Sequence, residues 1–332
     1  MELKAVVDNL FNCSIAKSTR ETYEAGFKTY VRFLLFTGVI AFIVPNNIPV
    51  NEEYLINFVA HCNSRLKISY STIKLYLCGI RFKCLEQGVS YPDNANLKRL
   101  QLVLNGVKRS HYTKSRPRYP ITFVVLKKVC LWLRKNSNFE HLLLEAMSTV
   151  TFFGFLRCGE FTVDSYERFD PAFNLCISDM TFLNDSVHLR LKISKTDPFR
   201  QGVTIKLFET GNIICPFKIC CRYMKERLKN NPTAEEPLFV DLSGFAVTRA
   251  KFLSLFSNAL NSVGYHSEQY SSHSFRIGAA SIAGTVHMED QMIKLLGRWS
   301  SDAYCRYIKT PDSVLKEAQN TLTHYISFNM VI

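Results

Sequence analysis

Three separated stretches of the sequence carry side chains whose types and spacing suit chemistry on an anionic group. They read GFLRCGEF, SKTDPFRQGV, and HSFR followed by LGRWSSDAYCRYI. Two planar guanidinium groups can hold an anion through paired, charge-assisted hydrogen bonds, and an acid nearby can orient them. The side chains that attract attention are, in chain order, Arg157, Glu160, Lys195, His273, Arg276, Trp299 and Tyr307.

These stretches resemble the pattern of the tyrosine recombinases, the family of the phage integrases and Cre-like enzymes. In that family an Arg is followed three residues later by an acid. A Lys in a β-turn, a His-x-x-Arg, a His or Trp and a nucleophilic Tyr come later. Arg157 and Glu160 match the first element, and Lys195 matches the second. His273 and Arg276 match the third, and the local sequences are most similar to recombinases of eukaryotic DIRS-like and Crypton-like mobile elements.

Two residues compete for the family's His or Trp position. Trp299 lies 23 residues after Arg276, as that position should, but eight residues before Tyr307 rather than nine. Arg298 lies nine residues before Tyr307, in the segment LGR that aligns with the family's LGH. We favour Trp299 because an indole both packs and donates a hydrogen bond, and which of the two touches the phosphate stays open. Tyr304 is only five residues after Trp299, so Tyr307 is the expected nucleophile.

The resemblance implies phosphoryl transfer on DNA. The phenol of Tyr307 would attack a phosphodiester while Arg157 and Arg276 stabilise the charge on its non-bridging oxygens. A free phenol has a pKa of about 10, which a cationic pocket lowers, and His273 would assist by accepting the proton. Lys195 is the family's candidate for the acid that protonates the leaving 5′ oxygen. The phosphotyrosine retains the bond energy, so religation would need neither ATP nor a metal.

Each of these residues also has an ordinary structural interpretation when it is taken alone. An Arg three residues from a Glu, as at Arg157 and Glu160, is usually a surface ion pair on a helix. In the catalytic interpretation the Glu would orient the Arg. Lys192 and Lys195 could be solvated residues at a strand end, and the chain has fifteen tyrosines. The catalytic interpretation is favoured because five elements occur in the family's order, with the Lys in a hairpin turn.

The composition is that of a globular protein with an anionic partner. Of the 332 residues, 47% are hydrophobic and 21% are charged, which excludes a disordered or low-complexity chain. The 41 Lys and Arg against 28 Asp and Glu give a net charge of +13, which favours a polyanion such as double-stranded DNA. Residues 1–120 hold 17 of the basic and 8 of the acidic residues, so the first third is the more basic part.

Several other kinds of site and environment are disfavoured. The sequence has no GxxxxGK[ST] and no GxGxxG after a strand, so we expect no ATP or dinucleotide cofactor. It has no CxxC pair, and Cys215, Cys220 and Cys221 lack a His at finger-like spacing, so we expect no metal site and reduced thiols. The longest apolar run, residues 33–44, is too short to span a membrane, and the N-terminus lacks the apolar region of a signal peptide.

The periodicity predicts a mainly α fold with a small antiparallel β-sheet, divided into two domains. Residues 1–107 would form a helical core-binding domain, and residues 121–332 the tyrosine recombinase catalytic domain, most of which the resemblance covers. A capping-box pattern from Ser18 to Glu21 opens the first expected helix. The expected helices lie at about 18–38, 51–62, 71–88, 95–107, 122–134 and 140–152, and again after 215. The expected strands lie at 187–193, 203–207 and within 175–182.

Residues 108–120, KRSHYTKSRPRYP, have the composition of a basic interdomain linker. The segment has five basic residues, no acid and two prolines. A charge run alone would favour a solvated loop or a nuclear-localisation-like patch, but the place between two globular segments favours contact with DNA phosphates. The expected DNA-binding residues are Lys108, Arg109, Lys114, Arg116, Arg118 and Arg298.

The sequence therefore favours a site-specific DNA recombinase or integrase of a mobile element that acts through a 3′-phosphotyrosine. The two domains would form a clamp around DNA, and four protomers would assemble on DNA while associating weakly or not at all when free. A segment that begins near residue 311 is long enough to pack on a neighbour. No membrane and no small-molecule substrate are expected, and the location would be the nucleus in a eukaryote, or otherwise the cytoplasm. The alternatives are type IB topoisomerase-like DNA relaxation and a domesticated, non-catalytic DNA-binding protein.

Overall fold

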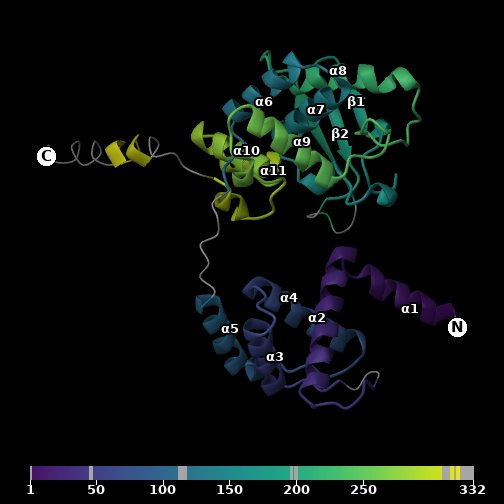
Figure 1. The fold of residues 1–332 in the computed structure, drawn as a ribbon, viewed down its shortest axis with the longest axis vertical. Coiled ribbons are helices and arrows are strands. Elements are labelled where there is room, and N and C mark those ends of the chain that lie inside the picture. The colour runs from purple at the N-terminus through teal and green to yellow at the C-terminus, as the bar shows by residue number, and fades with distance from the viewer. Residues whose placement is uncertain are drawn as a thin grey trace. The chain divides into compact units, whose positions relative to one another are not determined.

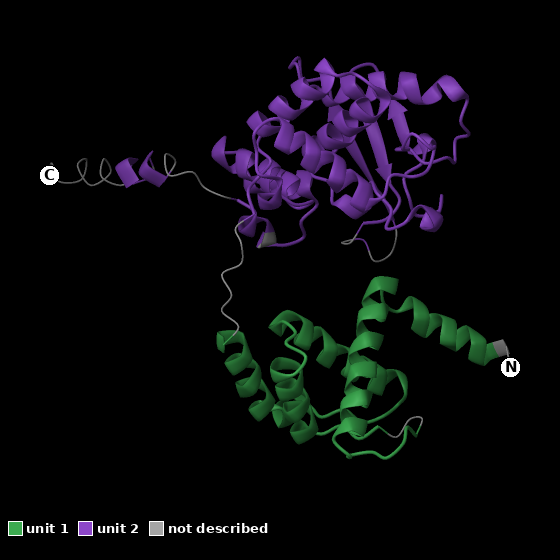
Figure 2. Cartoon of the chain, in the orientation of Figure 1, with its two compact units in different colours: residues 1–115 green, residues 116–332 purple. Residues whose placement is uncertain are grey.

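The computed structural model describes residues 2–44, 48–110, 118–194, 197, 201–308, 315–317 and 319–321. The chain divides into two compact units, residues 1–115 and 116–332, which Figure 2 colours separately. Both units are mainly helical, and the second also contains a three-stranded antiparallel sheet (Figure 1). The expected fold class, mainly α with a small antiparallel sheet, is confirmed.

Within the described residues, the first unit contains five α-helices. Their bounds are α1 (Glu2–Cys13), α2 (Lys17–Phe36), α3 (Glu52–Ser64), α4 (Tyr70–Glu86) and α5 (Lys98–Ser110). The last four correspond to the expected helices, and α1 is an addition. Side chains cap two of them as the sequence allows: Asn51 accepts a hydrogen bond from the Tyr54 N–H at 2.8 Å, and Ser69 accepts one from the Thr72 N–H at 3.2 Å.

The capping box expected from Ser18 to Glu21 does not form. Helix α2 begins at Lys17, and Ala16 occupies the N-cap position without a side-chain hydrogen bond. Ser18 lies inside the first turn, where its carbonyl accepts a hydrogen bond from the Thr22 hydroxyl at 2.9 Å. The expectation was wrong because α2 begins earlier than the motif indicates, and Ser18 is therefore a helical residue and not the N-cap.

The first unit has a hydrophobic core of its own. Tyr30, Leu34, Leu55 and Phe58 are fully buried, and the edge of the Tyr30 ring meets the Phe58 ring at a centroid separation of 5.2 Å. The buried Tyr30 hydroxyl donates a hydrogen bond of 2.9 Å to the Pro49 carbonyl, so its burial leaves no polar group without a partner. A separate core of this kind is what an independently folding unit needs.

The second unit surrounds one central helix. Its helices are α6 (Phe123–Lys135), α7 (Phe139–Phe153), α8 (Pro216–Arg227), α9 (Arg249–Ser262), α10 (Ser274–Thr285) and α11 (Asp290–Gly297). Eleven of the fifteen residues of α7 are buried, and α6, α8, α9 and α10 all pack against it (Figure 1). The side chains of Thr122 and Asn138 cap α6 and α7, so both expected helices begin within a residue of their predicted starts.

The sheet consists of β1 (Met180–Phe182), β2 (Ser186–Leu191) and β3 (Val203–Phe208), in the order β1-β2-β3. All pairs are antiparallel, and Leu189 of β2 lies opposite Met180 of β1 and Ile205 of β3. The period of two in β2 follows from burial, because Val187, Leu189 and Leu191 are buried while Arg190 between them is exposed. Strand β1 is shorter than the strand expected within 175–182, because residues 177–179 form a 3₁₀ turn.

The segment expected as a linker, residues 108–120, has structure at both of its ends. Helix α5 continues to Ser110, so Lys108 and Arg109 lie in its last turn. Residues 111–117, with Lys114 and Arg116, lie outside the described part of the chain. The Arg118 guanidinium donates to the Ser271 hydroxyl at 3.2 Å, and the Tyr119 N–H donates to the Gln269 carbonyl at 2.9 Å. The last residues of the expected linker are therefore hydrogen-bonded to the segment that precedes α10.

Helix α10 packs closely against Ile121, which directly precedes the N-cap of α6, and this contact gives a test of the fold. A Cβ atom on Gly278 would lie 1.8 Å from the Ile121 carbonyl oxygen, so Gly278→Ala forces the backbone of one segment to move. We expect a loss of about 1–3 kcal/mol or more in the free energy of unfolding of the second unit, measured by urea denaturation. Gly159→Ala is the matched control in the same unit, because a Cβ atom there meets nothing within 4 Å. Equal stability of both variants would contradict this packing.

Three further features concern the environments considered from the sequence. Among the described residues, no helix combines the length and the apolar character that a membrane crossing requires. The same residues contain no group of three His, Cys, Asp or Glu side chains that could hold a metal ion. All eleven cysteines are free thiols, and burial raises the pKa of Cys62 and of Cys130 to about 12.

Candidate active site

The first stretch of candidate residues follows directly after α7. The helix ends at Phe153, and Phe155 then adopts a left-handed backbone conformation with φ of 49°, which is uncommon for a bulky side chain. Arg157 lies two residues after Phe155 and is the N-cap of the short 3₁₀ turn Cys158–Glu160. The sharp turn after α7 leaves the carbonyls of Gly154 and Phe155 free to accept hydrogen bonds from side chains elsewhere in the unit.

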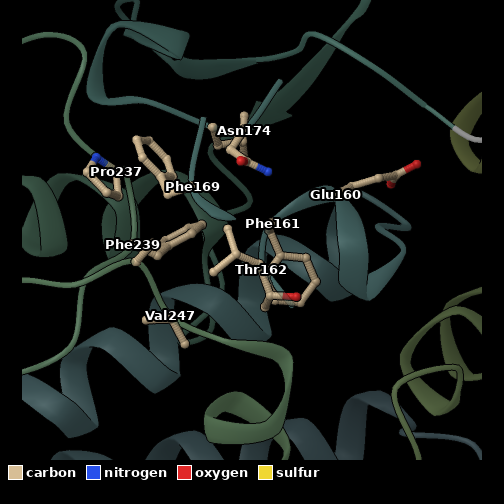
Figure 3. A pocket seen from close by; sticks show the side chains of 11 residues that line it. Glu160, Phe161, Thr162, Phe169, Asn174, Pro237, Phe239 and Val247 are labelled. Atoms are coloured by element: carbon tan, nitrogen blue, oxygen red, sulfur yellow. The ribbon is translucent and has the colours of Figure 1, made fainter. Parts of the chain in front are cut away.

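The Glu160 carboxylate is the centre of the site. One oxygen accepts hydrogen bonds from the Arg157 guanidinium at 2.9 Å and the Ser194 hydroxyl at 3.1 Å. The other accepts from the Arg157 backbone N–H at 2.8 Å and the Arg298 guanidinium at 2.8 Å. The Glu160 side chain is only 5% exposed, so these four donors offset the desolvation of its charge. Figure 3 shows its carboxylate directed away from a small pocket lined by apolar side chains such as Phe161 and Phe239.

Arg276, on the first turn of α10, lies deepest in the cluster. It is 1% exposed, and its two terminal nitrogens donate to the carbonyls of Phe155 at 2.6 Å and Gly297 at 2.8 Å. Its guanidinium lies over the Trp299 ring, 4.3 Å from the centroid. Burial, followed by the charges of Arg157 and Arg298, lowers the pKa of Arg276 to about 9. Arg276 remains charged at neutral pH but is held in a site with an excess of positive charge.

Trp299 joins this arginine to the candidate nucleophile. Its ring lies 5.6 Å from the ring of Tyr307 and 6.0 Å from the ring of Tyr304, measured between centroids. Trp299 also lies directly over Gly297, because a Cβ atom there would come within 1.6 Å of the indole. The residue that precedes Arg298 therefore has to be a glycine for the indole to reach Arg276.

The two tyrosines of this segment differ in their availability. Tyr304 is 2% exposed, and the hydrogen bond of its hydroxyl to the Asp290 carboxylate raises its pKa. Tyr307 is half-buried, and its backbone is fixed by a hydrogen bond of 3.1 Å from the Ser281 hydroxyl to its carbonyl. A buried phenol that donates to a carboxylate is a poor nucleophile, so the geometry favours Tyr307.

The remaining candidates are His273, Lys195 and the alternative acid Lys192. His273 is exposed directly before α10, one turn from Arg276. Lys195 lies outside the described residues, although Ser194 before it and Asp197 after it are described and form an isolated β-bridge. Lys192, which could have been an alternative acid, is engaged elsewhere: its ammonium contacts Asp179 at 2.6 Å and the Pro171 carbonyl at 2.7 Å.

The expected DNA-binding residues do not all lie at the surface. Lys108, Arg109 and Arg118 are exposed, as a phosphate contact requires. Arg298 instead points into the cluster, where its side chain is 10% exposed and binds Glu160 and two carbonyls. The structure therefore brings together Arg157, Glu160, Arg276, Arg298, Trp299 and Tyr307. The sequence analysis did not include Ser194 or the backbone carbonyls of Gly154, Phe155 and Gly297, which also contribute to the site. Only Ser194 could have been found from the sequence, because it directly precedes Lys195.

The fold of the chain is similar to that of several solved site-specific recombinases and integrases. It is similar to XerH site-specific recombinase bound to its palindromic difH substrate, with a TM-score of 0.60, 18% identity, and coverage of 88% of this chain and 75% of that chain. It is also similar to the Tn1549 transposon integrase in complex with transposon right-end DNA, with a TM-score of 0.58, 14% identity, and 92% and 94% coverage.

A third similar structure is a lambda integrase dimer bound to a COC′ core site, with a TM-score of 0.55, 12% identity, and coverage of 92% and 76%. At these identities the likeness establishes the fold. No protein-family model matches the chain, and no curated protein matches it.

Proposed function

We propose that this protein is a site-specific DNA recombinase that breaks and rejoins DNA through a 3′-phosphotyrosine at Tyr307. The observation that carries the proposal is the charge of the site. Three guanidinium groups, of Arg157, Arg276 and Arg298, gather around the single carboxylate of Glu160 beside Tyr307. A net charge of about +2 in a poorly solvated place favours an anion, and a phosphodiester supplies one next to a phenol.

The reaction would proceed by in-line displacement at phosphorus. The Tyr307 oxygen forms a bond to the phosphorus, and the bond to the 5′ oxygen of the next nucleotide breaks. His273 accepts the phenolic proton, and Lys195 donates a proton to the leaving 5′ oxygen. Arg157 and Arg276 stabilise the charge on the non-bridging oxygens. The reverse reaction, with a 5′-hydroxyl from another strand, reseals the DNA and regenerates Tyr307.

The partner we propose is double-stranded DNA. The net charge of +13 supports a polyanionic partner, and the similar recombinases and integrases are described as bound to their DNA sites. Phosphate contacts would dominate the affinity and make it strongly dependent on salt. We further propose that the two units close around the duplex as a clamp, that four protomers assemble on DNA, and that the DNA belongs to a mobile element.

Strand transfer in vitro tests the proposed function. The wild-type protein is incubated with a randomised pool of nicked duplexes, in EDTA and without ATP, and an oligonucleotide with a free 5′-hydroxyl is then added. We expect a covalent protein–DNA adduct first and a joined product second. A protein that binds the pool but never forms an adduct would be a non-catalytic DNA-binding protein. Relaxation of a supercoiled plasmid without any need for a second site would instead indicate a type IB topoisomerase.

Lys195→Ala gives a test of the proposed general acid. We expect this variant to cleave ordinary DNA slowly, because the leaving 5′ oxygen needs a proton. A bridging 5′-phosphorothiolate has a better leaving group that needs no proton, so the variant should recover most of its cleavage rate on that substrate. Arg276→Ala should not recover, since its defect concerns the non-bridging oxygens. Equal impairment of Lys195→Ala on both substrates would assign Lys195 an electrostatic role and leave His273 as the next candidate acid.

A further inference from the structure

Arg298 occupies an unusual place between the two arginines of the proposed reaction. Its guanidinium donates to the Gly154 carbonyl at 2.9 Å, the Phe155 carbonyl at 3.3 Å and the Glu160 carboxylate at 2.8 Å. Two of these three acceptors are shared. The Phe155 carbonyl also receives a hydrogen bond from Arg276, and the Glu160 carboxylate also receives one from Arg157.

This arrangement restrains all three guanidinium groups. Arg298 follows α11 in a left-handed conformation with φ of 54°, and its side chain reaches the turn that follows α7. The contact therefore joins two segments that lie 138 residues apart in sequence. Two different nitrogens of the Arg298 guanidinium make these contacts, and a Lys has only one nitrogen, so it cannot reproduce the same set of contacts.

The position of Arg298 has an energetic cost that the contacts must offset. Burial, opposed by the Glu160 charge and reinforced by the Arg157 charge, lowers the pKa of Arg298. An enclosed charge of this kind is stable only when it is paired and well hydrogen-bonded. Its partners are all protein groups, and its charge is paired with the Glu160 carboxylate before any DNA binds. The similarly enclosed Arg276 differs because its terminal nitrogens donate to neutral carbonyls, and Arg157 differs because its side chain is 19% exposed.

We infer that Arg298 is a positioning residue, which fixes Arg157 and Arg276 relative to one another through Glu160 and the Phe155 carbonyl, and is not a phosphate ligand. This inference rests on the proposed function, since it concerns the same reaction. It replaces the sequence-based expectation that Arg298 contacts DNA. Arg157 and Arg276 would then present a preformed site to the phosphate, and a displacement of either by about 1 Å can cost about 10²-fold in rate.

The test compares DNA binding with cleavage in Arg298→Lys and Arg298→Gln. Binding to a duplex is measured as a function of salt, and cleavage as single-turnover adduct formation on a nicked duplex. A phosphate ligand contributes about 0.9 to the slope of log K against log salt. We expect both variants to keep the wild-type slope and to lose about 10²-fold in cleavage, and the Lys variant, which keeps the charge, should be no better than the Gln variant.

Two further variants make the result decisive. Glu160→Gln weakens the same link, so the double variant with Arg298→Gln should lose little more cleavage than the worse single variant. Arg190→Gln is the charge-matched control, because Arg190 is exposed on β2. Thermal unfolding identifies any variant that fails to fold. If Arg298→Gln does not fold, the comparison of binding with cleavage is made with Arg298→Lys, which keeps the charge.

Three results would overturn the inference. They are a salt slope reduced by about one in Arg298→Gln, wild-type cleavage in Arg298→Lys, and an equal loss of cleavage in Arg190→Gln. Wild-type protein that forms no adduct on any duplex would instead contradict the proposed function. The wild-type reaction therefore distinguishes failure of the proposed function from failure of the inference about Arg298.

Discussion

Tyr307→Phe is expected to bind DNA with the wild-type affinity and to form no covalent adduct. The phenyl ring keeps its contact with Trp299, and the hydrogen bond from Ser281 reaches the backbone of residue 307, so the substitution leaves the site intact. Only the nucleophilic oxygen is lost. Affinity is measured by titration of a labelled duplex, and adduct formation by denaturing electrophoresis of the same mixture.

Tyr304→Phe is the control for this prediction. Its phenol donates to the Asp290 carboxylate and contributes to packing, so the variant should lose about 1 kcal/mol of stability and keep adduct formation. The opposite pattern, with an adduct in Tyr307→Phe and none in Tyr304→Phe, would assign the nucleophile to Tyr304.

Arg157→Ala and Arg276→Ala are each expected to lower single-turnover cleavage by about 10²–10³, with a much smaller effect on affinity. This is the usual cost of losing one preorganised donor to a charge that develops in the transition state. The two variants should differ in stability. Arg157 is 19% exposed, whereas Arg276 is 1% exposed and satisfies the carbonyls of Phe155 and Gly297.

Removal of Arg276 takes away the hydrogen bond to the Gly297 carbonyl and leaves the Phe155 carbonyl with the longer bond from Arg298. Arg276→Ala should therefore also lose about 1–3 kcal/mol in the free energy of unfolding. Urea denaturation measures this difference. If binding and cleavage fall by the same factor in either variant, the arginine is an ordinary phosphate anchor and the proposed role is incorrect.

The helices and strands that the sequence predicted are those with strong local signals. Asn51, Ser69 and Thr122 cap helices where their types favour it, and the alternation around Leu189 marks β2. Helix α1 was not predicted, and its apolar residues gain little from burial, since Leu3 is 81% and Leu10 is 65% exposed. The capping box near Ser18 did not form because α2 already begins at Lys17, which places Ser18 inside the helix.

For the candidate site, the order of the residue types predicted which side chains meet but not how they contact one another. Arg157, Arg276, Trp299 and Tyr307 come together as the pattern indicates. The inward direction of Arg298 depends on its left-handed backbone and on the turn at Phe155, which direct a side chain and a carbonyl toward each other. Such backbone directions have no signature in residue type, so the sequence left open whether Arg298 or Trp299 contacts the phosphate.

The most direct test of the central claim is to locate the covalent bond in the wild-type protein. The adduct trapped on a nicked duplex is digested with nuclease and protease, and the modified peptide is sequenced by mass spectrometry. We expect one modified residue, Tyr307, linked through its phenolic oxygen to a 3′-phosphate. A phosphate on any other residue, or an adduct at a 5′-phosphate, would contradict it.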